Sequence, residues 1–138
     1  MIGTTLGTSE WLSIDQQRVD AFAAVTGDDQ WIHVDPRRAA AGPFGTTVAH
    51  GFLTLSLLPV MVRTAFTLGD ARMTVNYGLN RVRFPAPVPV GSRVRGHFKL
   101  IAFEAIAGGA ALQVEVTIER EGHSKPVCVA QSVLRHFN

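Results

Sequence analysis

Cysteine is almost absent from this chain of 138 residues. Cys128 is the only one, so no disulfide forms within the chain, and we expect a reducing compartment, the cytoplasm. Residues 1–12 carry neither the basic nor the apolar region of a secretory signal, which favours the same expectation.

Clusters of charge of one sign are also missing. The chain has 13 basic and 11 acidic residues, which gives a formal net charge of +2. Arg37 and Arg38 are the only adjacent basic pair, and the other basic residues are dispersed. A nucleic-acid-binding surface is typically a basic stripe with interleaved aromatic residues. We therefore predict no nucleic-acid partner.

The chain also lacks a long hydrophobic run. Its longest apolar stretch, Phe52 to Val62, is interrupted by Thr54 and Ser56 and falls short of the roughly 20 residues that a membrane span needs. Apolar residues make up 46% of the chain and charged residues 17%, which is ordinary for a globular domain. We therefore predict no membrane segment and a single domain over residues 1–138.

The first half of the chain has the features of helices. Asp15 is a candidate N-cap for a helix of about three turns that ends near Thr26-Gly27. Asp35-Pro36 has the residue types that begin a second, short helix. Residues 52–62 are apolar on nearly every face, which predicts a helix buried at the centre of the domain. Pro59 predicts a kink or an early end in that helix.

The second half alternates apolar and polar residues with a period of two, which is typical of strands. The predicted strands cover residues 73–84, 92–103, 110–120 and 126–137. Gly108-Gly109 is suited to a hairpin connection between two of them. Helices followed by long antiparallel strands predict an α+β domain, in which a curled sheet wraps around the central helix.

Asp28 and His33 place a carboxylate and an imidazole five residues apart. Five helical residues rotate the chain by about 500°, so one regular helix would not bring these side chains together. Gly27 and Pro36 on either side favour a shaped loop. An acid and a base presented by a loop form a common catalytic arrangement. The alternative is that Asp28 caps a turn and His33 makes a local hydrogen bond.

The segment that carries the histidine is predicted to be extended from Trp31 to Val34. Alternation then places Ile32 and Val34 on a buried side, and it turns His33 toward a cleft on the other side.

Three motifs resemble the MaoC-like dehydratase family, which includes (R)-specific enoyl-CoA hydratases. Residues 27–33 resemble the family's hydratase signature, with a Gly-Asp step followed five residues later by His. His50-Gly51 resembles the pair that opens its central helix, and residues 82–91 resemble its strand and proline-valine-glycine turn. Trp31 and residues 76–80 are similar to the nodulation-protein-N branch. The resemblance spans essentially the whole chain.

The resemblance implies a hotdog fold and a cofactor-free hydro-lyase. Its substrates would be thioesters of coenzyme A or acyl carrier protein, hydrated at a trans-2-enoyl group to the (R)-3-hydroxyacyl product, or dehydrated in reverse. The family usually forms dimers whose sheets join edge to edge, so a homodimer is expected. By motif position, Asp28 and His33 are the catalytic pair, and Gly51 is the backbone donor to the thioester carbonyl. The alternative for Gly51 is that it only permits tight packing.

Several other residues are weaker candidates. His50 is a candidate substrate-binding residue, although it also suits fixing the geometry between the loop and the helix. Tyr77 and Asn80 are candidates near the pocket, but an alternating strand explains them as well. Asp29 is the rival carboxylate, and the Gly-Asp step favours Asp28. The spacing of these histidines does not match known metal motifs, so we predict no metal.

The chain departs from the family at two places. Gln30-Trp31 stands where the family usually has Asn-Pro, and Pro59 stands where some hydratases carry a serine that lines the pocket. Both departures bear on the shape of the acyl chain that the pocket accepts.

Two alternative functions stay open. A hotdog thioesterase would place a carboxylate on the central helix, and residues 50–66 contain none. A non-catalytic acyl-thioester-binding subunit of a hetero-oligomeric dehydratase would be expected to have lost Asp28 or His33.

Overall fold

The computed structural model of the chain describes residues 2–69 and 71–138, and within them six strands form one antiparallel sheet. The strands are β1 (Thr5–Thr8), β2 (Leu12–Ile14), β3 (Met73–Arg83), β4 (Ser92–Ile106), β5 (Gly109–Arg120) and β6 (Cys128–Phe137). Their order is β1-β4-β5-β6-β3, and β2 also pairs with β4. The helices are α1 (Gln16–Thr26), α2 (Trp31–Val34), α3 (Pro36–Ala40), α4 (Gly51–Ser56) and α5 (Leu58–Ala65).

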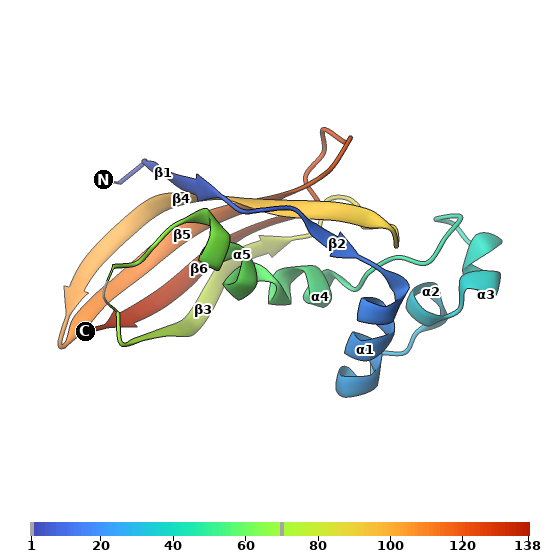
Figure 1. Cartoon of the computed structure of the whole chain (residues 1–138), viewed down its shortest axis with the longest axis horizontal. Helices are drawn as coiled ribbons and strands as arrows, with labels where there is room; N and C mark the ends of the chain where they lie inside the picture. The colour runs from blue at the N-terminus through green and yellow to red at the C-terminus, as the bar shows by residue number, and fades with distance from the viewer. Residues whose placement is uncertain (1, 70) are drawn as a thin grey trace.

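The sheet curls over α4 and α5, while α1, α2 and α3 lie beyond one end of it (Figure 1). This is the expected α+β arrangement of a sheet wrapped around a central helix. The four long predicted strands are present with bounds shifted by a few residues, and the hairpin between β4 and β5 turns at Gly108, which has a φ of 77°. None of the helices in residues 2–69 and 71–138 is both long and apolar enough to cross a membrane.

Local side-chain capping determines where the first helices begin. The Asp15 carboxylate accepts a hydrogen bond of 2.8 Å from the amide of Arg18 at the start of α1. Asp35 accepts one of 3.0 Å from the amide of Arg38 at the start of α3. Gly27, with a φ of 81°, ends α1 in the left-handed conformation that glycine adopts readily. The predicted starts of both helices are confirmed.

The prediction that Trp31–Val34 is extended is wrong, because these residues form α2. The amide of Asp35 donates a 3.0 Å hydrogen bond to the carbonyl of Trp31, which closes one helical turn. Four residues are too few to distinguish a period of 2 from a period of 3.6. The turn reverses the expected burial: His33 is buried, and the apolar residues on either side of it are only half-buried.

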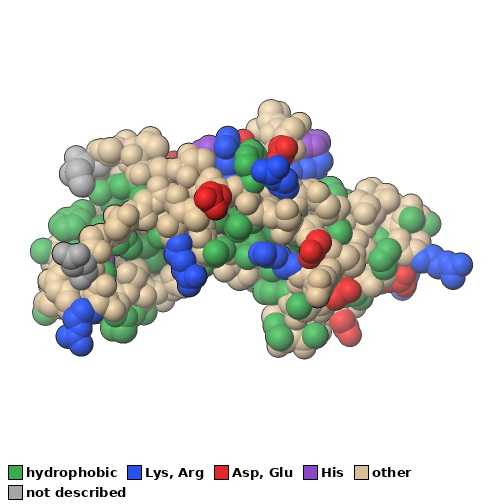
Figure 2. Space-filling model, viewed as in Figure 1, with side chains coloured by type: hydrophobic (Ala, Val, Ile, Leu, Met, Phe, Trp, Pro, Cys, Tyr) green, Lys and Arg blue, Asp and Glu red, His purple; other side chains and the backbone are tan. Residues whose placement is uncertain are grey.

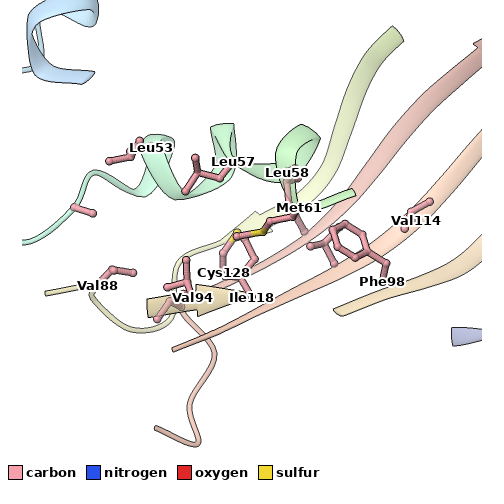
Figure 3. Packing of buried hydrophobic residues seen from close by; sticks show 14 of the residues in the cluster. Leu53, Leu57, Leu58, Met61, Val88, Val94, Phe98, Val114, Ile118 and Cys128 are labelled. Carbon is pink, nitrogen blue, oxygen red and sulfur yellow. The ribbon is translucent and has the colours of Figure 1, made fainter. Parts of the chain in front are cut away.

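The central helix is divided at Leu57, two residues before Pro59, so the predicted interruption is confirmed. Apolar side chains of α4 and α5 point toward buried side chains of the sheet (Figure 3). The labelled helical residues are Leu53, Leu57, Leu58 and Met61, and those of the strands are Val94, Phe98, Val114, Ile118 and Cys128. Burying each large side chain in this way stabilises the folded state by about 1.5–3 kcal/mol relative to leaving it exposed.

The prediction that the central helix is buried on all sides is wrong for the single chain. Phe52 at the start of α4 is 69% exposed, because the sheet covers only one side of the helix. All residues of β3 except Val82 are exposed, and no strand within the described residues pairs with its outer edge. Apolar side chains also reach the surface at the end of the sheet that carries the β4–β5 hairpin (Figure 2).

Candidate active site

The fold brings Asp28, His33 and His50 together from three separate segments. Asp28 lies in the loop after α1, His33 lies in α2, and His50 immediately precedes α4. One carboxylate oxygen and one ring nitrogen from each histidine all lie within 4.8 Å of one another. Asp29 is not part of this cluster within the described residues. The acid and base predicted from sequence spacing are therefore close in space.

The orientation of the His33 ring is determined by a backbone carbonyl. His33 Nδ1 lies 2.7 Å from the carbonyl oxygen of Val48. Because a carbonyl only accepts hydrogen bonds, Nδ1 carries the proton, and Nε2 of the neutral ring keeps its lone pair. The amide of Val48 in turn donates to the carbonyl of Ile32, and Gln16 Nε2 donates to the carbonyl of His33. The ring is buried and bonded at Nδ1, and the backbone that carries it is also held, as a positioned base requires.

Asp28 has the opposite environment, since it is exposed. Its amide donates a 3.3 Å hydrogen bond to Thr26 Oγ1, and its carbonyl accepts one of 2.8 Å from His50 Nε2. Both contacts are made by the backbone of Asp28, so they fix the position from which its carboxylate projects. An exposed carboxylate beside a buried imidazole gives water access to one side of the pair.

His50 contacts both members of that pair. It is 2% exposed, its Nε2 is bonded to the carbonyl of Asp28, and its ring stacks on that of His33 with centroids 3.9 Å apart. The ring of Phe22 packs against it at 4.9 Å. Among the described residues, Nδ1 of His50 is buried without a hydrogen-bond partner. This position fits the expectation that His50 fixes the loop to the helix better than direct substrate binding.

The stacking also bears on metal binding. The planes of the His33 and His50 rings are inclined by only 23° and their centroids are 3.9 Å apart, so the in-plane lone pairs of the two rings lie in separate, nearly parallel planes. The ligands of a zinc ion converge on one point in a tetrahedral arrangement. The residues therefore fit an acid–base pair with an adjacent supporting ring better than a metal centre.

A pocket of about 310 Å³ opens beside His33. Its wall includes His33, Gly51, Thr54, Phe44, Phe84 and the turn at residues 85–88. A Cβ on Gly51 would lie 2.9 Å from a ring carbon of Phe84, so glycine is needed for this packing. The Gly51 amide, in the first turn of α4, belongs to the orphan donors of a helix start and borders the pocket.

Thr54 is a site residue that sequence reasoning missed. It is 1% exposed and lines the pocket with His33 and Gly51. Its Oγ1 has no hydrogen-bond partner in the part of the chain that the structure describes. The available signal was a hydroxyl in a mostly apolar helix, three residues after Gly51.

Tyr77 and Asn80 lie elsewhere in the single chain. The exposed ring of Tyr77 lies 3.8 Å from the Arg135 guanidinium. Tyr77 also borders a second hollow, of about 460 Å³, between the central helix and β3, where Pro59 is found. Asn80 is exposed on β3 and lines neither hollow. The structure does not bring these two residues to the cluster within one chain.

Trp31, at one of the departures from the family pattern, packs against α3. The Arg38 guanidinium lies 4.5 Å from the centroid of its ring, and a Cβ on Gly42 would touch the same ring at 2.9 Å. Among the described residues that line the pocket beside His33, Trp31 is not found. Its role in this structure is to join α2 to α3.

Comparison with known proteins shows which family of proteins this chain resembles. Residues 1–122 match the family model of the MaoC like domain. The 3-hydroxyacyl-thioester dehydratase Z of Mycobacterium tuberculosis is 54% identical over 135 residues, covering 97% of this chain and 89% of that protein. Nodulation protein N of Rhizobium leguminosarum bv. viciae is 50% identical over 134 residues, covering 94% of this chain and 82% of that protein.

Solved structures show the same fold at lower sequence identity. An (R)-hydratase from A. caviae, described as involved in PHA biosynthesis, has a TM-score of 0.80 and 22% identity, covering 97% of this chain and 95% of that chain. The expected hotdog fold and the resemblance to the MaoC-like and nodulation-protein-N group are confirmed.

Proposed function

Because this chain belongs to the MaoC-like domain family, we propose that it adds water to trans-2-enoyl thioesters and catalyses the reverse dehydration of (R)-3-hydroxyacyl thioesters. The substrate would be carried by coenzyme A or acyl carrier protein, and no cofactor would be required. The observation that carries the proposal is the proximity of the Asp28 carboxylate to the oriented, buried ring of His33. The similarity to a protein named as a 3-hydroxyacyl-thioester dehydratase supports it.

The proposed mechanism transfers one proton through His33. Nε2 of the neutral ring takes a proton from water while the water oxygen forms a bond to C3 of the enoyl group. The Asp28 carboxylate orients the water and stabilises the imidazolium, which then returns the proton to C2 on the same face. A positioned acid–base group of this kind is typically worth about 10²–10⁴ in rate.

The addition also places negative charge on the thioester oxygen. We assign the Gly51 amide as the donor to this oxygen, because it borders the pocket that His33 lines. A preorganised donor at a developing oxyanion is typically worth about 3 kcal/mol. His50 has a positioning role, since it holds the backbone of Asp28 and supports the ring of His33.

We further propose a homodimer joined through β3. The outer edge of β3 has no partner strand within the described residues, and its side chains, including Val75, Tyr77 and Leu79, are exposed. Exposed edges and apolar patches of this kind usually mark an interface. The second copy would cover Phe52 and the hollow beside it. A cytoplasmic setting and a single domain over residues 1–138 complete the proposal.

Hydration assays test the function directly. Crotonyl-CoA and longer trans-2-enoyl thioesters are mixed with wild type, Asp28→Asn, His33→Gln and the matched control Asp29→Asn, and the loss of enone absorbance is followed. Each of the first two variants should lose at least 100-fold in kcat, and the control should keep wild-type activity. Folded variants that lose less than tenfold would show that the site is wrong.

The same assay separates the alternatives. A wild type that is inactive on every chain length and carrier would favour the non-catalytic binding subunit. Release of free thiol without hydration would favour a thioesterase.

A further inference from the structure

Thr54 is an unusual residue for the interior of an apolar helix. It is 1% exposed, and its Oγ1 makes no hydrogen bond within the described residues. A buried hydroxyl without a partner costs about 1–3 kcal/mol relative to a satisfied one. Most buried polar groups are satisfied, so such a group calls for an explanation. The fold alone therefore loses stability by keeping a hydroxyl here.

The position of Thr54 relates it to the proposed site. Thr54 and Gly51 are three residues apart in α4, so they lie on one face of the helix. A helical side chain leans toward the preceding turn, which here begins at Gly51. Both residues line the pocket that holds the buried ring of His33. Thr54, whose buried hydroxyl is unsatisfied, and the proposed amide donor thus line the same pocket.

We infer that Thr54 Oγ1 donates a hydrogen bond to the thioester carbonyl oxygen of the substrate, beside the Gly51 amide. A carbonyl oxygen has two lone pairs and accepts two donors. As the water adds to C3, this oxygen becomes an enolate oxygen, and both hydrogen bonds strengthen. Thr54 is then a catalytic residue, and the bound substrate supplies the partner that the protein lacks. This inference rests on the function proposed above.

A purely structural role makes different predictions. If Thr54 only fills space, valine, which has the same shape, should serve as well or better. Replacing an unsatisfied hydroxyl by a methyl group removes its desolvation cost, so Thr54→Val should keep or raise the melting temperature. A loss of activity in a more stable variant would not arise from damaged packing.

The experiment compares Thr54→Val, Thr54→Ser and the control Ser56→Ala, which removes a hydroxyl bonded within the same helix to the carbonyl of Leu53. We expect Thr54→Val to lose at least tenfold in kcat on crotonyl-CoA, with less than a threefold change in KM and an unchanged or higher Tm. Thr54→Ser keeps the hydroxyl and should stay within about threefold of wild type, as should Ser56→Ala.

Binding of the saturated thioester butyryl-CoA, measured by calorimetry, provides a readout without turnover. Thr54→Val should bind it more weakly than Thr54→Ser does, by less than about threefold, because the hydrogen bond strengthens mainly as the enolate oxygen forms. If wild type is active and Thr54→Val keeps its kcat and its affinity, the inference is wrong and the proposed function stands. If wild type does not hydrate any enoyl thioester, the proposed function and this inference fail together.

Discussion

The imidazole rings of His33 and His50 stack on each other, with centroids 3.9 Å apart and planes inclined by 23°. The two residues have different hydrogen-bond partners: the first is bonded to the carbonyl of Val48, and the second to the carbonyl of Asp28. One buried ring therefore supports both groups of the proposed acid–base pair. This relationship leads to a prediction about His50.

Two replacements of His50 should distinguish the effect of its hydrogen bond from the effect of its stacking. His50→Phe keeps a ring against His33 and loses the donor to Asp28, whereas His50→Gln keeps a donor and loses the ring. If the hydrogen bond positions Asp28, kcat should fall about tenfold or more in the Phe variant, with KM nearly unchanged, and recover partly in the Gln variant. Equal activity in the two variants would contradict this role. Steady-state hydration kinetics and circular dichroism are the measurements.

Gly51→Ala should be destabilising because its Cβ would lie 2.9 Å from the ring of Phe84. We expect a loss of about 1–3 kcal/mol in the free energy of unfolding and a lower kcat. Phe84→Leu in the same chain should relieve the overlap and restore both, since alanine keeps the backbone amide. The single Phe84→Leu variant is the control. Stability that returns without activity would mean that the ligand itself needs glycine at this position.

Cys128 should be unreactive in the folded protein. Burial raises the pKa of its thiol from the ordinary value of 9.0 to about 11. Thiol-specific reagents should therefore label it at pH 8 only after denaturation.

The same shift predicts a loss of stability at high pH. Above pH 9 the unfolded chain releases the proton while the folded chain keeps it, so stability is lost as the pH rises from 9.0 toward 11. At pH 10 this amounts to about 1.4 kcal/mol. Urea titrations at pH 8 and pH 10 should show a smaller decrease for Cys128→Ala than for wild type. Equal decreases would contradict the prediction.

A charge on the outer edge of β3 should separate the proposed dimer. Leu79 is exposed on that strand, and Leu79→Lys would place a charged group in the interface. Light scattering should then give the mass of one chain for this variant and of two for wild type. Val25→Lys is the matched control, because Val25 is 83% exposed on α1. A wild type that is monomeric at micromolar concentrations would contradict the homodimer.

Local chemistry explains why much of the fold was predictable. The Asp15 and Asp35 caps each join a carboxylate to an amide three residues away, so the segment alone determines the helix start. The alternation in β5 places Val114 and Val116 on the buried face, and long strands carry this signal over many residues. Pro59 disturbs the central helix wherever that helix lies, because it removes a backbone donor.

The spacing between Asp28 and His33 also predicted that they would be near each other, although the loop carries only Asp28, and His33 lies in α2. The motifs at these two residues and at Gly51 indicated the type of chemistry. Only the tertiary structure decided how the groups are oriented. The His33 ring is oriented by a carbonyl 15 residues away, and Asp28 by a ring 22 residues away.

The conformation of Trp31–Val34 and the unsatisfied hydroxyl of Thr54 were likewise decided by packing. A four-residue segment has no period of its own, and whether a hydroxyl finds a partner depends on every element around it. Sequence by itself determined which chemical groups are present and which elements carry them. Their orientation, burial and hydrogen-bond partners arise from contacts between distant segments, and spacing along the chain does not contain that information.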